Sequence, residues 1–199
     1  MAHDLVLLWL AALPLMGSPG PATLSCAAIG AAFGARAGLR YLAGIVAGTS
    51  AVLLMIATGV TGLILAEPAL VTAITILAAA YILYLAFRIA TAPVLGQVSA
   101  DAQSPSFPAA FVLAIANPKA FAAIGAVYSG HQLFPFDLLL DAAGKIAALV
   151  LVILLVNTAW LIFGASFSLV LKHPIAGRIA NLLFAIMLVA SVALALTGR

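Results

Sequence analysis

The chain reads as long apolar runs separated by short stretches that are polar or rich in proline and glycine. Apolar and polar residues do not alternate within the runs, which favours helices over the strands of a barrel. Each run approaches or exceeds the roughly 20 residues that a helix needs to cross a bilayer. We therefore expect an all-α integral membrane protein with six transmembrane helices. The predicted spans cover residues 5–33, 41–66, 69–89, 108–129, 138 or 142 to 167, and 179–197.

Prolines interrupt two of these runs. The first contains Gly17-Ser18-Pro19-Gly20-Pro21, and the fourth contains Asn117-Pro118-Lys119. Proline lacks a backbone donor and clashes with the carbonyl one turn earlier, so both helices should break inside the membrane. Carbonyls before each break and amides after it are then free, and the helix that begins near Pro21 would direct its positive end at a cavity. A kink that serves only packing is the alternative.

A polar stretch, 91–107, divides the chain near its middle. The halves that it separates, 1–90 and 108–199, hold three predicted spans each and must run in opposite directions. Each half also begins with a broken helix. The pattern predicts a single transmembrane domain, 1–199, built as a 3+3 inverted repeat whose broken first and fourth helices meet near the midplane.

Charge is scarce and unevenly placed. Only 7% of the residues are charged and 66% are hydrophobic, whereas about a quarter of a soluble domain is charged. The net charge of +3 comes from scattered single residues, which predicts no nucleic-acid partner. The connections after odd-numbered spans carry five basic residues and those after even-numbered spans carry one. By the positive-inside rule, the odd connections and the 91–107 linker are cytoplasmic and both termini are extracytoplasmic. The five are Arg36, Arg40, Arg88, Lys172 and Arg178; Lys145 is placed with Asp137 and Asp141 in the loop before the fifth span.

Lys119 is the exception, because it lies well inside an apolar span. A lysine there is costly and normally marks a substrate or proton pathway, although it could also extend its ammonium toward the membrane surface. Asn157 in the fifth span should face the interior, either as a hydrogen bond between helices or as part of a cavity wall. Thr49 and Ser50 can bond their own helix backbone, and Trp160 is expected to serve packing or interface anchoring.

Other residues point to packing and not to chemistry. Small residues recur at Gly30, Gly34, Gly38, Gly44 and Gly48, a spacing typical of close helix contacts. The histidines are too dispersed to predict a metal site, and no nucleotide-binding or nucleophile motif is present in the sequence. The sequence therefore predicts no cofactor. A single cysteine, Cys26, excludes an internal disulfide.

Several of these motifs together resemble the LysE/RhtB family of bacterial amino-acid exporters. Ser18-Pro19-Gly20-Pro21 and Gly34-Ala35-Arg36-Ala37-Gly38 are similar to its first two spans, residues 80–88 to the end of its third, and Phe107 through Asn117-Pro118-Lys119-Ala120 to its fourth. The resemblance implies a six-helix secondary exporter of amino acids or related metabolites in the bacterial plasma membrane, driven by proton exchange. Whether the chain forms a homo-oligomer stays open. The family motif positions fall on Pro19, Gly20, Pro21, Asn117, Pro118 and Lys119.

The chain departs from the family at Ala86, usually glycine, and at Phe121-Ala122-Ala123, where a bulky aromatic pair is common, so the substrate stays open. As a hypothesis, the substrate carboxylate would face Lys119 and the amides after Pro21, while its amine would face the freed carbonyls. A divalent-metal exporter, a thiol-redox conductor and a non-transporting assembly subunit remain alternatives. The lack of His, Cys or acidic clusters argues against the first, and the single cysteine argues against the second.

Overall fold

The computed structural model describes residues 2–59, 68–91, 106–167 and 174–197, and every regular element in them is an α-helix. The predicted all-helical class is thus confirmed. Residues 60–66 of the second predicted span and 92–105 of the predicted linker lie outside the described residues. The helices are α1 (Ala2–Gly17), α2 (Pro21–Ala57), α4 (Pro68–Ala90), α5 (Phe107–Ile115), α6 (Pro118–Gly130), α7 (Leu138–Phe167) and α8 (Pro174–Thr197).

Within the described ranges, two helical segments are long and apolar enough to cross a membrane, Pro21–Ala57 and Leu138–Ser166. The pair α5 and α6 would form a third if counted as one bent span. Leu138–Ser166 coincides with the fifth predicted span, whereas Pro21–Ala57 covers the end of the first predicted span and most of the second. The predicted count of six spans goes beyond the segments that meet this criterion in the described residues.

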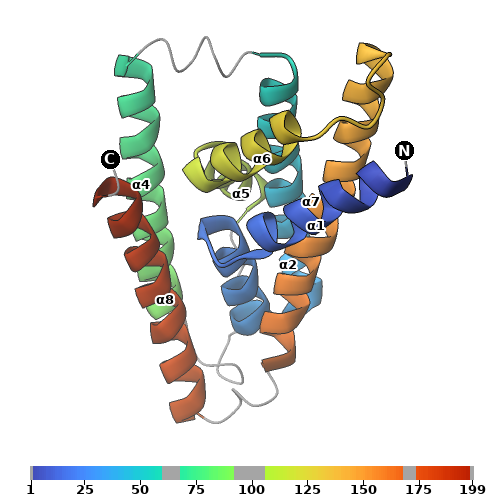
Figure 1. The fold of residues 1–199 in the computed structure, drawn as a ribbon. Helices are drawn as coiled ribbons and strands as arrows, with labels where there is room; N and C mark the ends of the chain where they lie inside the picture. Colours follow the sequence, from blue (N-terminus) through green and yellow to red (C-terminus); the bar gives the residue numbers. More distant parts are fainter. Residues whose placement is uncertain (1, 60–67, 92–105, 168–173, 198–199) are drawn as a thin grey trace.

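α2 is not one straight helix, because its backbone reverses at Gly34. That residue has φ 81° and ψ 163°, a left-handed conformation in which an L side chain would be strained. A Cβ placed on Gly38 would lie 3.3 Å from Cγ2 of Ile29, although a straight helix separates residues nine positions apart by about 13 Å. Figure 1 shows the blue beginning and the teal end of α2 running in opposite directions. The reversal falls between the first and second predicted spans.

Both predicted breaks are present. α1 ends at Gly17, and α2 restarts with Gly20 as its N-cap and Pro21 in its first turn. α5 and α6 meet at a bend of 59°, where Asn117 is the N-cap of α6 and Pro118 follows it. Proline suits the first turn of a helix because its missing N–H would have no partner there. The same local chemistry thus ends one helix and begins the next at both places.

α2 lies at the centre of the bundle and contacts α4, α5, α6, α7 and α8, while α4 and α8 pack side by side (Figure 1). Glycines permit the closest approaches. A Cβ on Gly164 of α7 would collide with the backbone carbonyl of Ala27, and one on Gly44 with that of Phe107 in α5. Two apolar clusters result. One joins α2, α4, α5 and α8 with Leu161 of α7, and the other joins α1, α6, α7 and the end of α2.

Candidate functional site

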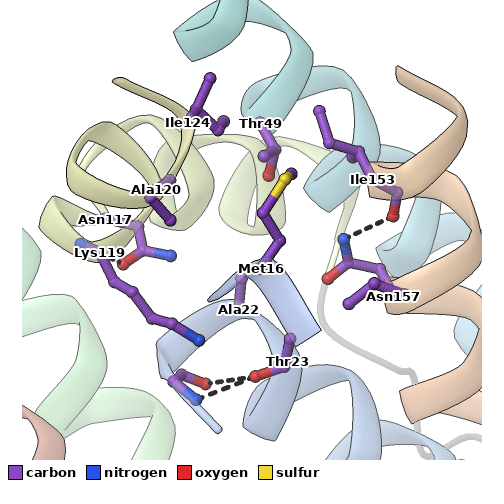
Figure 2. A pocket seen from close by; sticks show the side chains of 13 residues that line it. Met16, Ala22, Thr23, Thr49, Asn117, Lys119, Ala120, Ile124, Ile153 and Asn157 are labelled. Atoms are coloured by element: carbon purple, nitrogen blue, oxygen red, sulfur yellow. Dashed lines mark hydrogen bonds between the residues drawn. The ribbon is translucent and has the colours of Figure 1, made fainter. Parts of the chain in front are cut away.

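A pocket lies where the two helix breaks meet. Its volume is about 410 Å³, including the space at its open mouth. Its walls come from the end of α1, the first turns of α2 and α6, the second part of α2, and the middle of α7. Figure 2 shows Lys119 and Asn157 on opposite sides of this pocket, with Thr49 between them on a third side.

The structure brings together residues that are far apart in the sequence. Of the predicted site residues, Gly20, Asn117, Lys119 and Asn157 line the pocket directly. The three prolines do not line the pocket but lie at the helix breaks beside it. Pro21 and Pro118 occupy the first turns of α2 and α6, and the carbonyl of Pro19 accepts a hydrogen bond from Lys119.

Lys119 joins the two breaks. Its Nζ donates to the carbonyl of Ser18, and a second contact joins it to the carbonyl of Pro19 at 3.4 Å. The lysine side chain lies against Gly20, where a Cβ would be only 2.6 Å from the lysine Cδ. The lysine thus reaches across to the first break. The hypothesis that the freed carbonyls receive a substrate amine needs correction, because Lys119 Nζ lies on them and its charge repels a second cation.

The first backbone amides of α2, which begins at the pocket, have no full-turn partner in their own helix. The first full-turn hydrogen bond of α2 runs from the amide of Leu24 to the carbonyl of Gly20, at 2.8 Å. The amides of Ala22 and Thr23 come before it and make no full-turn bond of this kind. The Thr23 hydroxyl accepts from the Gly20 amide at 2.9 Å and lies 3.1 Å from the Gly20 carbonyl. At the start of α6, Oδ1 of Asn117 accepts from the Lys119 amide at 3.2 Å. With the Lys119 cation, the open α2 terminus makes this side of the pocket favourable for an anion.

Two buried oxygens on other walls of the pocket have no hydrogen-bond partner, Oγ1 of Thr49 and Oδ1 of Asn157. The prediction that Thr49 bonds its own helix backbone is therefore wrong. Sequence reasoning missed Thr49 as a pocket residue, because nothing local separates it from neighbouring Ser50. Whether its hydroxyl faces its own helix or a cavity depends on how three helices pack.

Trp160 was also missed as a residue of the site. Its indole N–H donates to the carbonyl of Gly17, the last residue of α1, at 3.0 Å. This carbonyl has no amide to accept from in its own helix, because the helix ends there. The tryptophan thus ties α7 to the first break, which positions the pocket without lining it.

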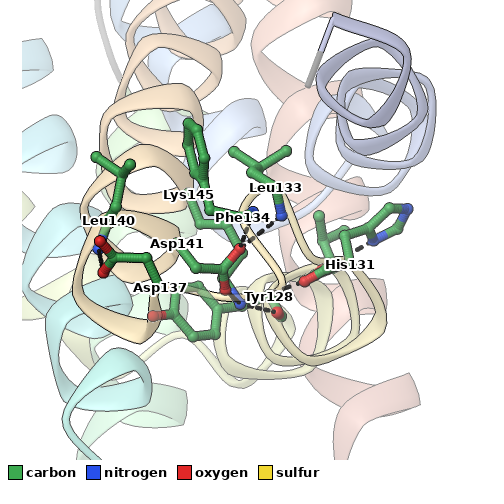
Figure 3. A network of polar contacts seen from close by, with 9 residues as sticks. Tyr128, His131, Leu133, Phe134, Asp137, Leu140, Asp141 and Lys145 are labelled. Atoms are coloured by element: carbon green, nitrogen blue, oxygen red, sulfur yellow. Dashed lines mark hydrogen bonds and ion pairs between the residues drawn. The ribbon is translucent and has the colours of Figure 1, made fainter.

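A second polar network lies where α6 turns into α7 (Figure 3). The prediction that Asp141 and Lys145 lie in a loop is wrong, since both are buried in the first turns of α7 and form an ion pair of 2.8 Å. Asp141 accepts from the amides of Leu133 and Phe134, while Lys145 donates to the carbonyls of Tyr128 and His131 at 3.2 Å each. The pair satisfies the backbone of the turn, which explains why it is tolerated in an apolar setting.

Apolar helices around a pocket at two helix breaks are the organisation of a membrane transporter. Residues 13–198 match the model of the LysE type translocator family, and the chain belongs to this family. The protein is accordingly a transmembrane efflux transporter and not an enzyme. The resemblance inferred from the proline and glycine motifs is confirmed.

Curated relatives point the same way. The chain is 30% identical over 172 residues to the cysteine/O-acetylserine efflux proteins of Salmonella choleraesuis and Salmonella typhimurium, covering 86% of this chain and 87% of theirs. The protein of the same description from Salmonella paratyphi A is 29% identical over the same length. No solved structure matches the chain significantly.

Proposed function

We propose that the chain is a secondary active exporter of small amino acids across the plasma membrane and that the pocket between the two breaks is its substrate site. The observation that carries this is Lys119, a cation that reaches from the start of α6 to the first break and is the charged residue among the described residues that line the cavity. The names of the relatives, which describe efflux of cysteine and O-acetylserine by those proteins, support a small amino acid as cargo here.

The walls of the pocket favour a small side chain. Ala22, Ala120 and Ala123 contribute only methyl groups, and the aliphatic side chains of Ile124 and Val156 limit the space further. A substrate with a short side chain of low polarity fits such walls, whereas a long basic one would need an acidic partner. No carboxylate lies among the described residues that line the pocket.

The substrate carboxylate would bind on the side of Lys119. An ammonium has three donors, and Ser18 and Pro19 take two of those of Lys119, which leaves one for an anion. The amides of Ala22 and Thr23 add backbone donors at the positive end of α2. Hydrogen bonds between charged groups are stronger than those between neutral groups.

Alternating access would follow from a 3+3 arrangement of six transmembrane helices. Each proposed half begins with a broken helix whose second part starts with a proline, α1 with α2 and α5 with α6. In Figure 1 the end of α2 and the beginnings of α4 and α7 lie toward one end of the bundle, and the ends of α4 and α7 lie toward the other. Rocking of one half against the other would open the pocket to each side in turn. The end bearing the Gly34 reversal and Arg36 would face the cytoplasm, with both termini outside.

The test is efflux from proteoliposomes loaded with neutral, basic or hydrophobic amino acids, with and without an imposed pH gradient. Small neutral amino acids should leave faster than from protein-free vesicles, and faster still when the external side is more acidic. Export that ignores the gradient would reject proton coupling alone. Failure with every amino acid would reject the proposed function.

A further inference from the structure

We infer that Thr49 and Asn157 form the subsite for the ammonium group of the substrate, on walls of the pocket away from Lys119. This assignment rests on the proposed function and adds the orientation in which the amino acid is held. It replaces the freed carbonyls of the first break as the acceptors for the amine.

The amide of Asn157 has a defined orientation. Its Nδ2 donates to the carbonyl of Ile153, one turn earlier in α7, at 2.8 Å. Because a carbonyl only accepts, the NH₂ group must lie there, and Oδ1 is left on the other side. Oδ1 has no partner, the residue is only 5% exposed, and Figure 2 shows the oxygen turned toward the pocket. A buried acceptor left unpaired is costly, so its persistence indicates a ligand.

Thr49 differs from three other hydroxyl residues of the described chain in how its hydroxyl is bonded. Thr58, Ser129 and Ser166 donate to the carbonyl four positions earlier, at 2.7–2.8 Å. The hydroxyl of Thr49 makes no such bond, is buried with the residue 6% exposed, and lines the pocket. It is free to accept from a donor in the cavity.

The positions of the charges decide which end of the substrate reaches these oxygens. Lys119 and the positive end of α2 repel an ammonium, and the carbonyls of Ser18 and Pro19 are engaged by the lysine. An ammonium taken from water needs acceptors far more than a hydroxyl or thiol does. Oδ1 of Asn157 and Oγ1 of Thr49 are the unpaired side-chain oxygens that the described walls offer.

The experiment compares an amino acid with the same molecule lacking its amine. Inhibition of labelled L-cysteine exchange in proteoliposomes is measured for L-cysteine and for 3-mercaptopropionate, in wild type, Thr49→Val and Asn157→Leu. Each variant should weaken inhibition by L-cysteine by about 10- to 100-fold and leave that by 3-mercaptopropionate within about twofold. Thr49→Ser and Asn157→Asp, which keep the acceptor oxygen, should retain the preference for L-cysteine.

Retained inhibition by 3-mercaptopropionate also shows that a variant is folded. The assignment is overturned if Thr49→Val weakens inhibition by L-cysteine and by 3-mercaptopropionate equally, or changes neither. The comparison of the two inhibitors in Thr49→Val is sufficient for this test even if Asn157→Leu does not fold. If wild type exchanges no amino acid at all, the proposed function fails and this assignment with it.

Discussion

The side chain of Lys119 packs against Gly20 in the space that a larger residue would fill. This contact determines where the Lys119 ammonium lies in the pocket. Gly20 has φ −173°, extended backbone that any residue can adopt, so its small size matters here and not its flexibility. A methyl group at this position would come within 2.6 Å of Cδ and 3.1 Å of Nζ of Lys119. The flexible lysine side chain can move aside, which displaces its ammonium from the first break.

Gly20→Ala should therefore reduce transport more than stability. We expect the KM for export to rise by about 10-fold or more, because a charged hydrogen bond to the substrate is lost, while thermal unfolding changes little. Kinetics in proteoliposomes and unfolding in detergent measure the two effects. Gly125→Ala is the matched control, since a Cβ there meets nothing within 4 Å. Unchanged kinetics in Gly20→Ala would mean that the position of Lys119 does not matter.

The chemistry of single residues was predictable only where the sequence is locally unusual. Lys119 could be found because a charge inside an apolar run is costly wherever the helix packs. Thr49 could not, because a helical threonine ordinarily bonds its own backbone, and its departure from that pattern follows from packing against other helices. Trp160 was visible as a large amphipathic side chain, but its partner Gly17 lies 143 positions earlier.

Helix ends were predicted well where proline sets them. The breaks before Pro21 and Pro118 follow from the missing donor and the clash with the preceding turn, both local properties of the chain. The turn between α6 and α7 was predicted less well. Asp141 and Lys145 look like loop charges in the sequence, and their burial depends on backbone groups of residues 128–134 that the fold brings near.

Asp141→Asn should destabilise the protein by about 3 kcal/mol, because Lys145 would stay buried without its counter-charge. Reversible unfolding in mixed detergent measures this. The double variant Asp141→Asn with Lys145→Gln should cost less than the sum of the single changes. Asp137→Asn is the control, since Asp137 is exposed and accepts from the amide of Leu140 at 2.9 Å, as asparagine also can. Equal effects at 137 and 141 would contradict the role assigned to the buried pair.

The whole bundle has two distinct ends, and the proposed orientation assigns them to opposite sides of the membrane. One end of the bundle bears the Gly34 reversal, which is followed by the exposed residues Arg36 and Arg40. The other end bears the turn between α6 and α7, where α7 begins (Figure 1). Basic residues close to the ends of spans are held on the cytoplasmic side. The proposed placement follows from the distribution of basic residues along the sequence.

Cysteine labelling in cells tests the orientation. Gln132→Cys should react with a membrane-impermeant maleimide in intact cells, and Ala37→Cys should react only after the cells are permeabilised. Both parent residues are exposed, whereas the native Cys26 is fully buried and contributes no background. Labelling of both positions from the same side would reject the proposed topology.

The central claim is that the two helix breaks and Lys119 form the substrate site, and exchange by a Lys119→Met protein tests it most directly. Methionine keeps an unbranched side chain of similar length and removes the charge. We predict normal insertion with L-cysteine exchange reduced by at least about 10-fold, while Arg178→Gln, a charge removed from an exposed position of α8, exchanges like wild type. Full exchange by the correctly inserted Lys119→Met protein would contradict the account.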